Sequence, residues 1–225
     1  MITEPICGGA LIFPPKEYYE QLRKIAEEHG ILWIDSEVMA GWGRTGYWFA
    51  YQYYGVKLDI MTMAKGIISS HLPCGGVVVS KEIAKFFEDY RWWHAVTFSA
   101  HPVVMAAVVA NIKYMIEEKL PQRAAKMGEY LGKRLKELEE KHKCVGHVDG
   151  LGLWWGIEIV KNKKTKEPFI KEDKYTRGAG DMPLFPMNLV FAKCIEKGVL
   201  CSGFVPNGIR VGPALTITEE EIERC

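Results

Sequence analysis

Short apolar runs alternate with amphipathic segments through the first half of the chain. Residues 11–13 predict a short strand, and residues 17–29 carry apolar side chains at the spacing of a helix face, which Gly30 ends. The apolar positions of that helix are Tyr18, Leu22, Ile25 and Ala26. Residues 31–34 are uniformly apolar, which is typical of a strand buried on both faces of a parallel sheet. A helix followed by a buried strand indicates a βαβ unit.

Two more strands are expected in this half. Residues 60–64 form an apolar run that ends at Lys65, and residues 76–80 lead into a helix at 81–87. Polar residues at the carboxyl end of a buried strand mark the ligand-binding edge of open α/β sheets. Asp35 and Ser36 follow the strand at 31–34, as Lys65 follows its own strand. We therefore expect an α/β fold with a mostly parallel sheet and a site at this edge.

Lys65 is the first candidate for chemistry. The pattern places its amine at the end of an apolar strand, beside a loop of glycine and serine and in otherwise dry surroundings. Loss of water lowers the pKa of an amine, and a neutral amine attacks carbonyl groups to form Schiff bases. The alternative is a solvated lysine that ends a strand, which is the commoner use of this residue.

The second half predicts two consecutive helices. An apolar helix at 103–118 is followed by a charged one at 122–142, which bears Leu131, Leu135 and Leu138 on one face. Proline is tolerated at a helix start, so we place the domain boundary near Pro121. This gives a large domain at 1–120 and a small α+β domain at 121–225.

The small domain is expected to alternate strands and helices. Its clearest segments are a strand at 151–160, a polar and mobile loop at 161–180 and a helix at 188–197. Thr218 and Glu221 have the spacing of a capping box, and the helix that they open has little room before Cys225. This pattern suggests that the sequence is an internal piece of a longer protein.

Composition excludes several classes of function. The chain has 225 residues, 48% of them apolar, and 29 basic residues against 28 acidic ones. This balance gives no overall field that favours nucleic acid or an anionic membrane. The six cysteines are scattered without the spacing of metal ligands, so we expect no metal site and reduced thiols in the cytoplasm. Neither a signal segment nor a membrane-spanning run is expected.

Five blocks in a fixed order identify a family resemblance. The blocks are Gly41-Trp42-Gly43-Arg44-Thr45-Gly46, Asp59-Ile60-Met61-Thr62-Met63-Ala64-Lys65-Gly66, Leu72-Pro73-Cys74-Gly75-Gly76, Thr97-Phe98-Ser99-Ala100-His101-Pro102 and Gly208-Ile209-Arg210-Val211-Gly212-Pro213-Ala214-Leu215. Together they resemble the class III aminotransferases, which use pyridoxal 5'-phosphate. The resemblance implies a fold type I subunit, in which a large cofactor-binding domain is followed by a small C-terminal domain.

The resemblance also implies roles for single residues. Lys65 matches the lysine that holds the cofactor as a Schiff base and then moves a proton to and from it. Thr97 matches the threonine that reaches the cofactor phosphate of the neighbouring subunit, although a threonine there could instead cap a helix. Arg210 matches the arginine that binds a substrate carboxylate, and its alternative is a surface arginine in a turn. Val38 matches the apolar residue against one face of the cofactor ring, a position that ordinary core packing would also explain.

The chain departs from the family pattern at the partner of the ring nitrogen. Ser36 stands where the family has an aspartate, and Asp35 comes one residue earlier. Neighbouring side chains on a strand point to opposite faces, so Asp35 reaches the ring only through a bulge or a register slip. A serine can bond to the nitrogen but cannot keep it protonated, and the protonated ring is the stronger electron sink. We therefore expect strongly impaired transamination if Ser36 is the partner.

The predicted function is transfer of an amino group from an ω-amino acid or amine to a keto acid such as pyruvate, by a homodimer. Two alternatives remain open: a pyridoxal-phosphate-dependent aminomutase, and a non-catalytic or truncated remnant of such an enzyme. No segment matches the family's N-terminal portion, which supplies the phosphate loop and the aromatic that stacks on the cofactor. Weak or no cofactor binding is therefore expected of residues 1–225 alone.

Overall fold

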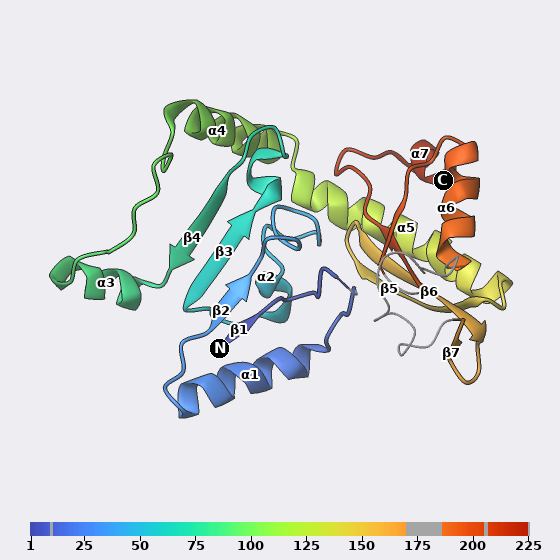
Figure 1. Cartoon of the computed structure of the whole chain (residues 1–225), viewed down its shortest axis with the longest axis horizontal. Coiled ribbons are helices and arrows are strands. Elements are labelled where there is room, and N and C mark those ends of the chain that lie inside the picture. Colours follow the sequence, from blue (N-terminus) through green and yellow to red (C-terminus); the bar gives the residue numbers. More distant parts are fainter. Residues whose placement is uncertain (10, 170–185, 205–206, 225) are drawn as a thin grey trace, which may run out of the picture. The chain divides into compact units, whose positions relative to one another are not determined.

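The computed structural model describes residues 1–9, 11–169, 186–204 and 207–224. These residues form two compact units. The first comprises Met1–Gly8 and Phe13–Gln122, and the second comprises Gly9–Ile12 and Arg123–Cys225. The predicted α/β class is confirmed, since the first unit carries a mixed sheet with helices beside it (Figure 1).

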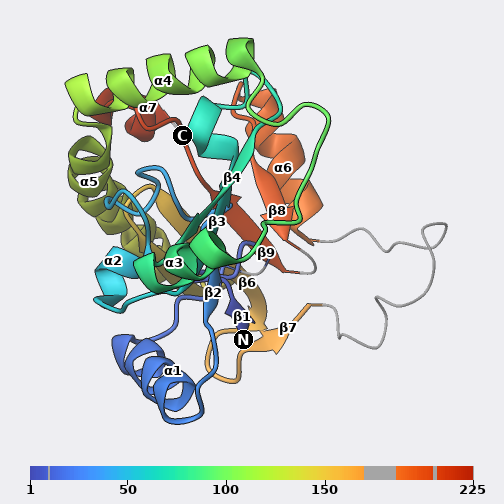
Figure 2. The same ribbon diagram turned by 90° about the vertical axis from the view of Figure 1, so that its left-hand side faces the viewer.

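The first unit is built on a sheet of order β1-β2-β3-β4. Its elements are β1 (Ile2–Thr3), α1 (Lys16–Glu28), β2 (Ile34–Ser36), α2 (Tyr51–Tyr54), β3 (Ile60–Ala64), the 3₁₀ turn η1 (Lys65–Ile68), β4 (Gly75–Val79), α3 (Lys81–Asp89) and α4 (Pro102–Glu117). The strands β1, β2 and β3 are parallel, and β4 is antiparallel to β3. The parallel strands bring the ends of β2 and β3 to one edge of the sheet, as the sequence predicted. Figure 2 also shows α4 beside the turn that follows β3.

Two short strands were predicted at the wrong residues. The strand expected at 31–34 begins only at Ile34, because the amide of Trp33 donates to the carboxylate of Asp59 at 2.7 Å instead of to a neighbouring strand. No strand forms over residues 11–13, and the edge of the sheet is Ile2–Thr3 instead.

The buried face of α1 also differs from the prediction. Tyr19 and Ala26 are buried, whereas Tyr18 and Ile25 are exposed. Tyr19 is buried because its ring stacks on the ring of Tyr54, with centroids 4.1 Å apart. Its hydroxyl donates a hydrogen bond of 2.5 Å to the backbone carbonyl of Glu4. A tyrosine can bury its ring only where its hydroxyl finds such a partner.

The second unit is an antiparallel sheet of order β5-β6-β9-β8, with β7 paired to β6. Its elements are α5 (Leu120–Lys141), which begins in the first unit, β5 (Val145–Leu151), β6 (Trp154–Asn162), β7 (Glu167–Pro168), α6 (Pro186–Glu196), β8 (Ser202–Phe204), β9 (Gly208–Val211) and α7 (Glu219–Arg224). The strand expected at 151–160 is found as β6, but it begins only at Trp154, because Leu151 ends β5 and the chain turns at Gly152, which has φ of 58°. Part of the expected loop at 161–180 is strand, and its residues 170–180 lie outside the described residues.

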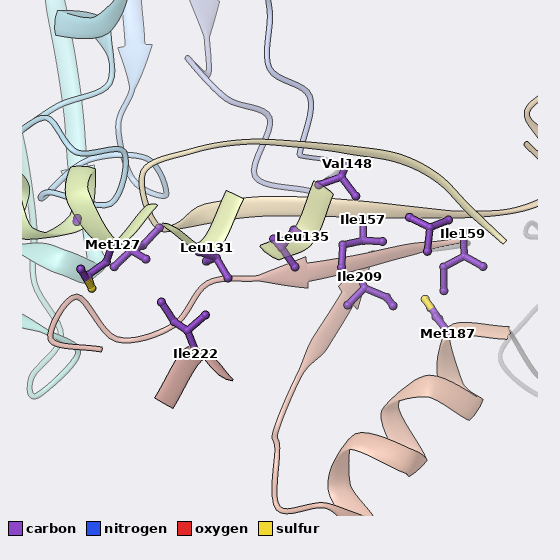
Figure 3. Packing of buried hydrophobic residues seen from close by; sticks show 12 residues of the cluster. Met127, Leu131, Leu135, Val148, Ile157, Ile159, Met187, Ile209 and Ile222 are labelled. Atoms are coloured by element: carbon purple, nitrogen blue, oxygen red, sulfur yellow. The ribbon is translucent and has the colours of Figure 1, made fainter. Parts of the chain in front are cut away.

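The core of the second unit forms between α5 and the sheet (Figure 3). Leu131 and Leu135 of α5 belong to the same buried cluster as Ile157 of β6 and Ile209 of β9. Leu138 was expected on this face but is 39% exposed, because it lies one turn nearer the end of the helix, beyond the cluster.

The last helix begins as the sequence predicted. The amide of Thr218 donates to Oε2 of Glu221 at 2.9 Å, and the amide of Glu221 donates to Oγ1 of Thr218 at 3.3 Å. These two bonds form a capping box. Across the described ranges, no helix has the length and apolar content needed to cross a membrane.

Leu131→Ala should lower the free energy of unfolding of the second unit by about 2–5 kcal/mol, because it leaves a cavity in the core. Leu138→Ala, on the same helix, should cost less than about 1 kcal/mol. Urea unfolding of both variants measures the difference. Equal losses would show that the cluster is not the core of this unit.

Candidate active site

The pairing of β2 with β3 decides which side chains face the candidate site. The partners are consecutive, with Asp35 opposite Met61 and Ser36 opposite Thr62, so no bulge or slip interrupts the pairing. The amide of Glu37 continues the ladder and donates to the carbonyl of Thr62 at 2.9 Å. Paired residues point to the same face of a sheet. Asp35 and Ser36 therefore point to opposite faces.

The Asp35 face is closed. Its carboxyl is fully buried, and its Oδ1 accepts a hydrogen bond of 2.9 Å from Oγ1 of Thr3. The same Thr3 oxygen accepts a bond of 2.8 Å from the indole of Trp33. Burial, then the nearby charge of Glu37, raises the pKa of Asp35 to about 7. This carboxyl is thus a sequestered group that is largely protonated below neutral pH.

The Ser36 face is only half-buried. Ser36, the last residue of β2, and Thr62, in the middle of β3, lie side by side on it and place two hydroxyls on neighbouring parallel strands. Thr62 was not singled out from the sequence. In the sequence, the one feature that pointed to Thr62 was its position three residues before Lys65. Its neighbour Ser36 is seen only from the pairing of β2 with β3.

Glu37 is a second buried carboxyl that sequence reasoning did not use. Its Oε1 accepts a hydrogen bond of 2.7 Å from the amide of Tyr51, at the start of α2. Burial raises the pKa of Glu37 to about 7, although the amides of Ala50 and Tyr51 oppose that rise. Glu37 thus ties the start of the glycine-rich loop to α2. Val38 follows it in a turn and is half-buried.

Lys65 follows the last residue of β3, as predicted, but its side chain is exposed. The expected dry surroundings are therefore wrong for the described chain. Lys65 lies one residue beyond the last pair between β3 and β4, which joins Ala64 to Gly75, so its side chain is not flanked by a paired strand. Lys65 has φ of 46°, a left-handed conformation that turns the chain sharply into η1.

Asn111 of α4 is the residue nearest to this turn that the sequence did not reveal. Its Nδ2 donates to the carbonyl oxygens of Gly66 and Ile67, both at 3.0 Å. Its Oδ1 accepts from Oγ of Ser69 at 2.7 Å. The sequence feature that could have pointed to Asn111 is its polar amide side chain in an otherwise apolar stretch of helix.

Thr97 is exposed in the turn that precedes α4. The cap residue of that helix is His101, so the alternative in which Thr97 caps the helix is wrong. The blocks at 72–76 and 97–102 meet in space, because both line a cavity of about 650 Å³. Lining residues include Pro73, Cys74, Phe98, Ser99 and His101.

Arg210 lies in β9 of the second unit, so the reading of a surface arginine in a turn is wrong. It pairs with Gly156 on one side and Ser202 on the other. Its guanidinium carbon is 5.4 Å from the ring centroid of Trp154, within the range of a cation–π contact. The strand and the indole together fix the direction of this cation.

Nothing in the described ranges groups three or more metal-ligating side chains into a possible ion site. The polar groups near the ends of β2 and β3 are the amine of Lys65 and the hydroxyls of Ser36 and Thr62. An amine in such a position can react covalently with the carbonyl group of an organic ligand.

The comparison with protein families matches residues 1–225 to the family described as aminotransferase class-III. This chain belongs to the class-III aminotransferases. The predicted family and fold type I are thereby confirmed.

Relatives of known name support the assignment. The putrescine–pyruvate aminotransferase of Pseudomonas aeruginosa is 44% identical over 225 residues, which cover 99% of this chain and 46% of that protein. An S-selective transaminase from Arthrobacter sp., solved with alanine bound, superposes with a TM-score of 0.93 at 47% identity and covers 99% of this chain and 48% of its own. A taurine:2-oxoglutarate aminotransferase from Bifidobacterium kashiwanohense, solved with PLP and glutamate, gives a TM-score of 0.90 at 38% identity, with coverage of 99% and 48%. The chain thus spans about half the length of these relatives.

Asp35→Asn should change how the stability of the first unit depends on pH. The folded pKa of about 7 lies above the ordinary 3.8, so the stabilising contribution of protonated Asp35 is complete below about pH 4 and is lost as pH rises through 7. The amide cannot titrate, yet it can still accept the bond from Thr3. The free energy of unfolding of the variant, relative to the unmodified chain, should therefore rise from pH 4 to pH 8.

Urea unfolding at a series of pH values measures this difference. Asp89→Asn, an exposed carboxyl on α3, is the matched control and should run parallel to the unmodified chain. A parallel curve for Asp35→Asn as well would contradict the burial argument.

Proposed function

We propose that this protein is a pyridoxal-phosphate-dependent aminotransferase that moves an amino group from an ω-amino acid or amine to a keto acid such as pyruvate. The main support is the position of Lys65, which directly follows β3, the strand on which Thr62 pairs with Ser36 of β2. The chain also belongs to the aminotransferase family. The named relatives that act on putrescine and on taurine support this class of donor.

The residues present fit pyridoxal phosphate. An exposed amine at Lys65 is open to an aldehyde, and the hydroxyls of Ser36 and Thr62 on the half-buried face can bond to a polar ring atom. Val38 offers an apolar contact to a ring. When bound, the cofactor supplies an electron sink for the bond that breaks at the substrate carbon.

Each candidate residue then has a defined task. Lys65 binds the cofactor aldehyde through its amine and carries the proton that leaves the substrate carbon. Arg210 binds a substrate carboxylate, for which its planar guanidinium is suited. Thr97 donates a hydroxyl to a phosphate, in our proposal that of a neighbouring subunit in a homodimer.

Ser36 is the proposed partner of the ring nitrogen, and Asp35 is not. The support is geometric, because the Asp35 carboxyl points to the closed face and is bonded to Thr3. We further propose a large cofactor domain at residues 1–120, a small domain at 121–225 and a location in the cytoplasm. The scattered cysteines support the location, since none of the described ones is in a disulfide.

Lys65→Ala should abolish the visible absorbance band that pyridoxal phosphate gives on forming a covalent link to the protein, because no other amine takes its position. The measurement is made on a chimera in which residues 1–225 replace the segment they match in the Pseudomonas aeruginosa relative, because a weak band or none is expected of residues 1–225 alone. Lys85→Ala, an exposed lysine on α3, is the control and should keep the band. A band that survives Lys65→Ala would remove the lysine from its proposed role.

The same chimera separates the reaction classes. Amino transfer requires pyruvate and forms alanine, whereas an aminomutase returns the amine to the same carbon skeleton without a keto acid. A chimera that binds the cofactor and turns over neither way would favour a non-catalytic remnant.

Exchanging the two residues, Asp35→Ser with Ser36→Asp, should raise the rate of amino transfer in the chimera at least about tenfold. A carboxylate beside the ring nitrogen raises the pKa of that nitrogen by about one unit or more and strengthens the electron sink. The single change Asp35→Ser controls for the loss of the buried carboxyl. An unchanged rate in the double variant would refute Ser36 as the limiting position.

A further inference from the structure

The turn that carries Lys65 is bound by a side chain to which the proposed chemistry gives no role. The side-chain nitrogen of Asn111, Nδ2, donates two hydrogen bonds to this turn. They go to the carbonyl oxygens of Gly66 and Ile67, both at 3.0 Å. It also accepts the hydroxyl of Ser69 at 2.7 Å. One side chain of α4 thus fixes three of the four residues that follow Lys65.

The turn needs outside support to keep its shape. Lys65, Ser69 and Ser70 all have positive φ, at 46°, 48° and 61°. Residues other than glycine rarely adopt this conformation, because the side chain crowds the following carbonyl. A 3₁₀ turn of four residues has weak internal hydrogen bonds. Without the bonds from Asn111, the backbone would relax and change the direction in which Lys65 leaves β3.

The side of the turn toward the glycine-rich loop is closed by packing. A side chain at Gly66 would lie 2.6 Å from Cβ of Trp42, so that indole occupies all the space beside the backbone. The turn is therefore held by Trp42 through contact and by Asn111 through hydrogen bonds.

The surroundings of Asn111 favour these bonds. It is partly buried on α4, near Val108 and Met115, which are 9% and 2% exposed. Its Nδ2 is also 3.7 Å from the sulfur of Met115. The two bonds to the carbonyls are themselves partly buried, so losing them costs the amide free energy that water only partly restores.

We propose that Asn111 is the positioning residue of Lys65, and that its two donated bonds hold the lysine amine where it reacts with the cofactor aldehyde. This inference rests on the proposed role of Lys65. It also makes the placement of Lys65 depend on α4, the helix that follows the Thr97 turn.

The test traps the reacting lysine in the chimera introduced above, in which residues 1–225 replace the segment they match in the Pseudomonas aeruginosa relative. The amine condenses with the aldehyde of pyridoxal phosphate and releases water, and borohydride then delivers hydride to the C=N carbon, which leaves a stable secondary amine. Mass spectrometry of peptides gives the labelled fraction at each lysine. We expect Lys65 to label faster than Lys85 in the unmodified chimera. Asn111→Ala should lower labelling at Lys65 about tenfold, the effect of losing two hydrogen bonds, and leave Lys85 unchanged.

Two variants separate positioning from general destabilisation. Asn111→Asp keeps the size and the acceptor for Ser69 but cannot donate to the carbonyls, so it should lose as much labelling as Asn111→Ala. Ser69→Ala leaves both carbonyl bonds in place and should label like the unmodified chimera. Circular dichroism sets a temperature at which every variant is folded, and the Lys85 signal is the internal reference.

The outcomes are distinct. Undiminished labelling of Lys65 in Asn111→Ala or in Asn111→Asp overturns this inference alone. A loss in Ser69→Ala as large as in Asn111→Ala overturns the assignment to the carbonyl bonds. An unmodified chimera that shows no preference for Lys65 over Lys85 overturns the proposed function, and this inference with it.

Discussion

The register between β2 and β3 is the constraint on which the site depends. It pairs Ser36 with Thr62 and Asp35 with Met61 without interruption. Because side chains alternate along a strand, this pairing assigns each polar group to a face. A shift of one residue would bring the Asp35 carboxyl to the open face and send the Ser36 hydroxyl into the core. The chemistry of the sheet edge is therefore set by backbone hydrogen bonds and not by the order of residues alone.

Burial sequesters the Asp35 carboxyl on the closed face of the sheet. The carboxyl accepts from Thr3 and shares its closed face with Tyr19 and the Trp33 indole, and its pKa is raised to about 7. Such a group is tolerated in a core because it can be neutral. The half-buried face carries the hydroxyls of Ser36 and Thr62. In our proposal the protein therefore combines the lysine of the family pattern with a neutral partner for the ring nitrogen.

The Lys65 turn shows how function depends on elements distant in sequence. Trp42 from the glycine-rich loop fills the space beside Gly66, and Asn111 from α4 bonds the carbonyls that follow. Both residues act on the backbone of the turn and not on the amine itself. Lys65 is therefore exposed while the backbone that follows it is held in place, an arrangement that suits the role we propose for its amine.

The sequence by itself determined the family, the α/β class and most element positions, because ordered motifs, helical periodicity and caps such as Thr218 with Glu221 are local properties. It predicted Lys65 at the end of β3 for the same reason. Only the tertiary structure decided that Asp35 points away from Ser36's face, that Tyr19 and not Tyr18 is buried, and that Lys65 is exposed. It alone revealed Thr62 and Asn111, since their partners lie across a strand pairing and a helix contact. Such contacts depend on which distant residues meet in the fold, and no local pattern encodes them.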